Sequence, residues 1–198
     1  MTGHHIITFT LLRDVYNLLV DQHITTQIPA ARVALRQFLL LVDRQLPGLD
    51  SLIDRLRAES DKKRDGPNKL AKLEVHEINY LHAAAVWPAW NTVIGPANRS
   101  DDPKDHYDSK DYYMDRFTAG LTAEEAARVP MIDRLFREMK TFVNCGQPSS
   151  GNLTAFGQAA SAARSVLNCD SPIPYRADMW VADVGGKWRK RRDAGAAG

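Results

Sequence analysis

Residues 2–9 have the sequence TGHHIITF, which places two adjacent histidines, His4 and His5, directly before a helical pattern. An imidazole has an unperturbed pKa of about 6.5, so it exchanges a proton close to neutral pH. One ring of such a pair can bind a divalent metal ion while its neighbour acts as a general base. Adjacent residues of an extended segment point to opposite sides, so one of the two can equally be structural.

Apolar residues recur at helical spacing through most of the chain after this pair. The spacing predicts helices over residues 10–22, 29–45, 49–56, 70–86, 132–143 and 152–168. Thr122 and Glu125 form a capping box that starts a helical segment, and Pro130 is expected to interrupt it.

Two parts of the chain are expected to contain β structure. One is the histidine pair, and the other is residues 175–191, where Gly185 and Gly186 can form the turn of a hairpin. Residues 59–69 and 95–111 are rich in turn-forming and charged residues and are predicted to be loops. The predicted fold class is α+β, mainly α-helical, with residues 1–198 forming a single domain.

The composition is typical of a globular protein. Of 198 residues, 44% are hydrophobic and 25% are charged, and the formal net charge is +2. No apolar run approaches the roughly 20 residues that span a bilayer, and the first residues lack the pattern of a secretory signal. We therefore expect no membrane association. Cys145 and Cys169 do not form a CxxC pair, so metal binding by cysteine is not expected, and spacing leaves a disulfide between them open.

Basic residues are concentrated near the end of the chain around Trp188. The cluster consists of Lys187, Arg189, Lys190, Arg191 and Arg192. Such a cluster is typical of a surface that binds the phosphates of nucleic acid. A solvated tail that aids solubility is an equally good interpretation of so short a basic run.

A second group of polar residues lies in residues 87–103, which have the sequence WPAWNTVIGPANRSDDP. Asn91 and Asp102 offer oxygen ligands suited to magnesium, and Arg99 is suited to a phosphate. His106 follows among carboxylates, where an exposed loop histidine is the simpler interpretation. Asp101 and Asp102 can also form a turn before Pro103.

Three other side chains receive structural interpretations. His82 lies on a predicted apolar face and is expected to be a core histidine with its hydrogen bonds satisfied. Trp87 and Trp90 are expected to be packing anchors around Pro88 rather than platforms on which nucleobases stack.

The sequence GHHII, residues 3–7, resembles the signature of the toxin branch of the HNH/endonuclease VII (His-Me finger) nucleases. In that family Gly-His-His or Ala-His-His opens the motif, and proline often stands where this chain has Thr8. The family places an asparagine or histidine downstream, and Asn91 matches it. Because His5 and Asn91 are 86 positions apart (91 − 5), either a helical insertion at about residues 25–70 has entered a small ββα-metal core, or the downstream partner is another residue.

The resemblance implies His5 as the general base, His4 as a metal ligand, and Asn91 as a second ligand or an orienting residue. Residue type alone suggests Asp102 and His106 as further ligands and Arg99 as a contact to the scissile phosphate. Magnesium fits the oxygen ligands best, while imidazole also suits manganese, zinc or nickel.

The expected function is a metal-dependent endonuclease that hydrolyses the phosphodiester bonds of DNA, with RNA as a second possible substrate. The resemblance further implies an interbacterial toxin, carried on a larger protein by a type VI or contact-dependent system into the target-cell cytoplasm and neutralised by a cognate immunity protein. The alternative is a non-catalytic helical interaction module whose basic tail binds an acidic partner. A non-nuclease hydrolase that uses His5 as a base is a third option, although the sequence has no GxSxG nucleophile motif.

Overall fold

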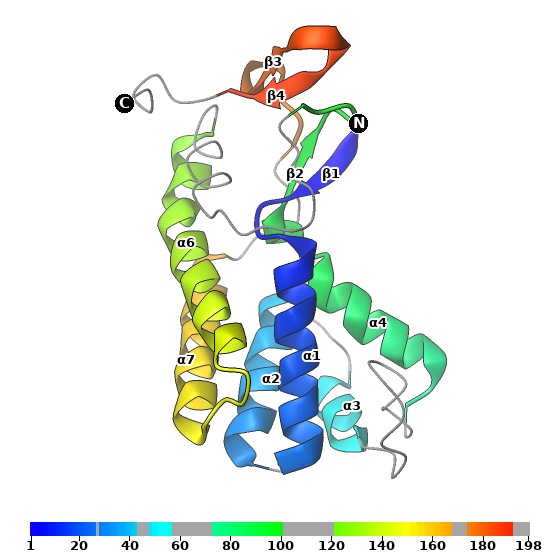
Figure 1. The fold of residues 1–198 in the computed structure, drawn as a ribbon, viewed down its shortest axis with the longest axis vertical. Coiled ribbons are helices and arrows are strands. Elements are labelled where there is room, and N and C mark those ends of the chain that lie inside the picture. The colour runs from blue at the N-terminus through cyan, green and yellow to red at the C-terminus, as the bar shows by residue number, and fades with distance from the viewer. Residues whose placement is uncertain (27, 43–47, 57–72, 101–120, 168–173, 192–198) are drawn as a thin grey trace.

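The computed structural model describes residues 1–26, 28–42, 48–56, 73–100, 121–167 and 174–191, without the side chains of Thr2, His4, Val42 and Lys190. A helical body carries two small antiparallel sheets at one end (Figure 1). The helices are α1 (Phe9–Thr26), α2 (Pro29–Val42), α3 (Leu49–Arg55), α4 (Val75–Val86), α6 (Ala123–Asn144) and α7 (Ser150–Val166). The strands are β1 (Thr2–His5), β2 (Thr92–Gly95), β3 (Trp180–Ala182) and β4 (Trp188–Lys190). This architecture confirms the predicted α+β, mainly helical class.

The hydrophobic core lies where α1, α2, α6 and α7 pack together. Phe156 of α7 stacks on Phe142 of α6, with ring centroids 4.7 Å apart, and meets Phe38 of α2 at 6.1 Å. At the crossing of α2 and α7, a Cβ on Gly157 would lie 3.4 Å from the Cα atom of Ala34. The small residues therefore let the two backbones approach closely, and the aromatic rings fill the space on the side of α6.

Thr8 begins α1 by capping it. Its hydroxyl accepts a hydrogen bond from the backbone N–H of Leu11 at 3.3 Å, and its carbonyl accepts one from Leu12 at 3.2 Å. The first N–H groups of a helix have no partner within the helix, and a threonine side chain satisfies one of them. Thr8 thus caps α1 at the position where the nucleases whose signature GHHII resembles often have proline.

The capping box of Thr122 and Glu125 is present at the start of α6, as predicted. The predicted interruption at Pro130 is wrong, because α6 continues through it. Pro130 is exposed, whereas Val129 before it and Ile132 after it both pack on the core. The apolar stripe therefore continues past the proline, and its burial outweighs the single backbone hydrogen bond that proline removes.

The sheet of β1 and β2 joins the two ends of a long helical segment. The strands are antiparallel, with Thr2 opposite Gly95 and His5 opposite Thr92. The segment between them includes the described helices α1, α2, α3 and α4. The insertion at about residues 25–70 lies within this segment and stays a prediction.

The predicted C-terminal hairpin is confirmed. β3 and β4 are antiparallel, and both Gly185 and Gly186 in the turn between them have positive φ, at 74° and 73°. Trp188 also forms a parallel bridge to the chain after β2: its N–H donates to the carbonyl of Asn98 at 2.9 Å, and its carbonyl accepts from the N–H of Ser100 at 2.8 Å. Two sequence-distant parts of the chain are thereby joined at this end of the molecule.

We expect Gly95→Ala to detach this hairpin from β2. A Cβ on Gly95 would lie 2.2 Å from the ring of Trp180, which is buried, so the indole must move out. Overpacking of this kind costs about 1–3 kcal/mol. Thermal denaturation followed by tryptophan fluorescence measures the change. Gly151→Ala, at an exposed site in α7, is the matched control, since alanine favours helix there. Equal melting curves for both variants would contradict the close contact.

Candidate active site

The ring of His5 lies at the end of β1 and is held from two sides by the end of α4. Its Nε2 atom is 2.8 Å from the carbonyl oxygen of Val86, and its ring centroid is 4.1 Å from that of Trp87, at a 44° tilt. A carbonyl only accepts hydrogen bonds, so Nε2 must carry the hydrogen. In the neutral ring, Nδ1 therefore carries the lone pair that a general base needs.

Asn91 fixes the turn that follows His5. Its side chain is fully buried: Oδ1 accepts from the N–H of Ile7 at 2.6 Å, and Nδ2 donates to the carbonyl of Ile7 at 2.8 Å. The backbone carbonyl of Asn91 also accepts from the N–H of Ile6 at 2.9 Å. Because both ends of the carboxamide are engaged with Ile7, the geometry favours an orienting role for Asn91 over that of a metal ligand.

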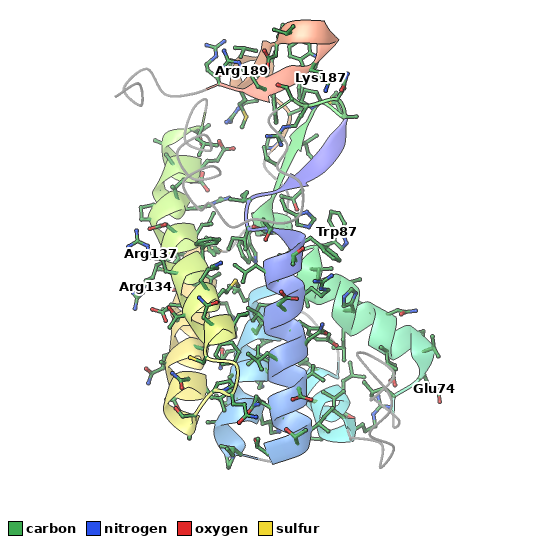
Figure 2. The ribbon with its side chains drawn as sticks, in the orientation of Figure 1. Glu74, Trp87, Arg134, Arg137, Lys187 and Arg189 are labelled. Carbon is green, nitrogen blue, oxygen red and sulfur yellow. The ribbon has the colours of Figure 1, made fainter. Side chains whose placement is uncertain are left out.

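The two tryptophans of this segment have opposite environments. Trp90 is buried and donates from Nε1 to the carbonyl of Leu41 at 2.9 Å, so the prediction of a packing anchor is confirmed. For Trp87 that prediction is wrong, since this residue is 56% exposed. The reason is local: α4 ends at Val86, and Trp87 projects outward there, before the short turn Ala89–Asn91 directs the chain inward (Figure 2).

His82 lies on α4, one helical turn before Val86, whose carbonyl binds the His5 ring. It is half-buried, with Phe9 at 6.3 Å and Tyr16 at 5.9 Å between ring centroids. Partial burial, and then the nearby charge of Arg13, lower the pKa of His82, so the neutral ring is favoured. Burial raises the pKa of Tyr16, whose hydroxyl has no hydrogen-bond partner among the described residues. His82 of α4 and the rings of Phe9 and Tyr16 of α1 thus form the side of the candidate site that faces α1.

The predicted metal ligands are only partly visible. No three His, Cys, Asp or Glu side chains within the described ranges come together as a group able to hold a metal ion. The side chain of His4 lies outside the described set, although its backbone pairs with Val93. Asp102 and His106 also lie outside the described residues. The metal site therefore stays a prediction.

Arg99 lies with the C-terminal hairpin and not beside His5. It follows Gly95, which pairs with Thr2 at the end of the sheet away from His5, and its guanidinium carbon is 4.8 Å from the centroid of the Trp180 ring. The structure therefore brings Arg99 toward the basic cluster, whereas the sequence suggested a place at the scissile phosphate.

The basic cluster extends along β4 and its turn. Lys187 is exposed at the end of the hairpin with Arg189 close by (Figure 2), and Arg191 is exposed after β4. The side chain of Lys190 and all of Arg192 lie outside the described set. The carboxylate of Asp183 lies in the turn of this hairpin: a hydrogen bond from the Ser100 hydroxyl, followed by one from the Val184 N–H and by the charges of Arg189 and Lys187, lowers the pKa of Asp183.

Two features of the site have no predictive signal in the sequence. The contact of His5 with Val86 uses a backbone carbonyl, which every residue has, and the clamp on Ile7 likewise uses backbone atoms. The exposure of Trp87 has a weak signal, because Pro88 predicts a helix end there.

No described helix combines the length and apolar character needed to cross a membrane. Comparisons with protein-family models, with curated proteins and with solved structures find no match to this chain.

Proposed function

We propose that the protein is a divalent-metal-dependent endonuclease that cleaves DNA, or RNA as the second candidate substrate, with His5 as the general base. One observation carries the proposal: the end of the GHHII segment is hydrogen-bonded to Asn91 of the WPAWN segment, which lies far away in the sequence, directly before β2. Asn91 holds the backbone directly after His5, and Val86 holds its ring. A base fixed in tautomer and orientation is what proton abstraction from water requires.

In the proposed reaction, Nδ1 of His5 takes a proton from a water molecule, whose oxygen attacks the phosphorus. The bond from phosphorus to the leaving ester oxygen breaks, and that oxygen gains a proton from solvent. The proposed metal ligands are His4, Asp102 and His106. A bound divalent ion supplies positive charge that stabilises the charge on the phosphate and the leaving oxygen.

The basic cluster is proposed to bind the sugar-phosphate backbone, together with Arg99. Lys187, Arg189 and Arg191 lie at the end of the molecule that also holds Arg99 through Trp180 and Trp188. Contacts of this kind neutralise phosphates and release counterions, so binding should weaken with salt and show little sequence preference.

We propose that the chain acts as an interbacterial toxin, delivered on a larger carrier into the target-cell cytoplasm. A cognate immunity protein would then be its inhibitory partner. This part of the proposal rests on the resemblance of residues 3–7 to the toxin nucleases.

The test is incubation of the purified protein with plasmid DNA and with total RNA, in separate reactions containing magnesium, manganese, zinc, nickel or EDTA. We expect one substrate to be cleaved with at least one metal and neither to be cleaved in EDTA, with activity restored when metal is added back. Isothermal titration calorimetry with manganese gives an independent readout of metal binding. Cleavage that persists in EDTA would reject the metal requirement. Absence of cleavage under every condition would reject the nuclease and favour an interaction module.

A further inference from the structure

Trp87 exposes a large aromatic surface beside the proposed catalytic base. The residue is 56% exposed, whereas Trp90, three residues later, and Trp180 are buried. Single exposed apolar residues are common on proteins and by themselves need no explanation. The position of Trp87 is what distinguishes it, because the exposed indole lies against the ring of His5.

The geometry around Trp87 fixes the indole relative to His5. The backbone N–H of Trp87 donates to the carbonyl of Ala83 at 3.0 Å and so ends α4, and the preceding carbonyl, that of Val86, binds the His5 ring. The indole centroid lies 4.1 Å from His5 and 6.3 Å from Phe9. Two consecutive residues therefore hold His5, one through its carbonyl and the other through its ring, while Trp87 as a residue remains 56% exposed.

We propose that Trp87 is the substrate-binding residue on which a nucleobase stacks, next to the phosphodiester bond that His5 attacks. A base can lie on an indole only when it is unstacked from its neighbours, so the preferred substrate is a single-stranded segment of nucleic acid. Every base has an aromatic face, so this contact gives affinity without sequence preference. The inference deepens the nuclease proposal and rests on it for the position of the reacting bond.

The experiment measures binding in EDTA, where the proposed cleavage does not occur. Fluorescence anisotropy compares two fluorescein-labelled single-stranded DNA oligonucleotides of equal length, one with bases and one with abasic residues throughout. Both carry the same phosphates, so their contacts with the basic cluster are alike. Wild-type protein is expected to bind the oligonucleotide with bases roughly 5- to 100-fold more tightly.

Three variants locate that preference. Trp87→Ala should reduce binding of the oligonucleotide with bases to the level of the abasic one, and Trp87→Phe should retain most of the preference. Val75→Ala removes an exposed apolar side chain at the other end of α4 and should leave binding unchanged. Melting curves for each variant verify that the fold is intact, as expected for a side chain that is mostly exposed.

Two results would overturn the proposal: wild-type protein that binds both oligonucleotides equally or not at all, or a Trp87→Ala variant that keeps the wild-type preference. Failure here is distinct from failure of the nuclease proposal. Cleavage with no base preference would reject stacking alone, whereas base-dependent binding without cleavage under any metal would reject the nuclease and leave Trp87 as a nucleic-acid contact.

Discussion

Replacing His5 with alanine is expected to lower metal-dependent cleavage by about 10²- to 10⁴-fold, the usual contribution of a general base. The ring is fixed by the Val86 carbonyl through Nε2, so its other nitrogen has the basic lone pair in the neutral state. Removing the imidazole leaves the sheet and the Asn91 clamp in place, because the sheet is formed by backbone atoms and the Asn91 side chain binds the backbone of Ile7, not the ring of His5. Single-turnover cleavage of a labelled substrate measures the loss.

His23→Ala is the matched control for His5→Ala. The Nε2 atom of His23 also lies against a backbone carbonyl, that of Ile53 at 3.0 Å, near the far end of α1. Both variants lose an imidazole that contacts a backbone carbonyl, but only the change at His5 should affect cleavage. Equal cleavage by the two variants, with equal melting temperatures, would remove His5 from the proposed chemistry.

Asn91→Ala is expected to destabilise the protein by about 2–5 kcal/mol. The variant leaves the N–H and the carbonyl of Ile7 without their partner, in a place where Ile7 is 1% and Asn91 0% exposed. Each buried polar group left without a hydrogen bond costs about 1–3 kcal/mol. Urea denaturation monitored by circular dichroism gives the change in the free energy of unfolding.

Asn98→Ala is the control for this effect. Asn98 is exposed, and its side chain donates a long hydrogen bond to the carbonyl of Gly186 at 3.5 Å, so the expected change is within about 0.5 kcal/mol. If both variants unfold at the same urea concentration as the wild type, the clamp on Ile7 does not hold the site together.

Local pattern predicted most of the helical structure because the relevant signal lies within each segment. The capping box of Thr122 and Glu125 and the glycine turn of the hairpin depend on side chains only a few residues apart, and both are present. Pro130 was misjudged because its effect depends on which face of α6 it occupies. The packing of Val129 and Ile132 on either side decides that, and packing is a tertiary property.

The candidate site was predictable only as a set of residue types. The sequence suggested His5 and Asn91 as candidates, but the contacts that hold them pass through backbone atoms of Ile7 and Val86, for which no side-chain pattern exists. The placement of Arg99 depended on the bridge to Trp188, between residues 89 positions apart (188 − 99). Interactions over such distances follow from the whole fold and not from local spacing.

The pairing of β1 with β2 has a consequence for the order of folding. His5 and Thr92 are 87 positions apart (92 − 5), and closing a loop of that length costs roughly 4 kcal/mol in chain entropy beyond a constant. Contacts of such high sequence separation form after local helices have shortened the distance to be closed. His5 would thus meet its partners late, so the chain would carry an unassembled site through the early stages of folding.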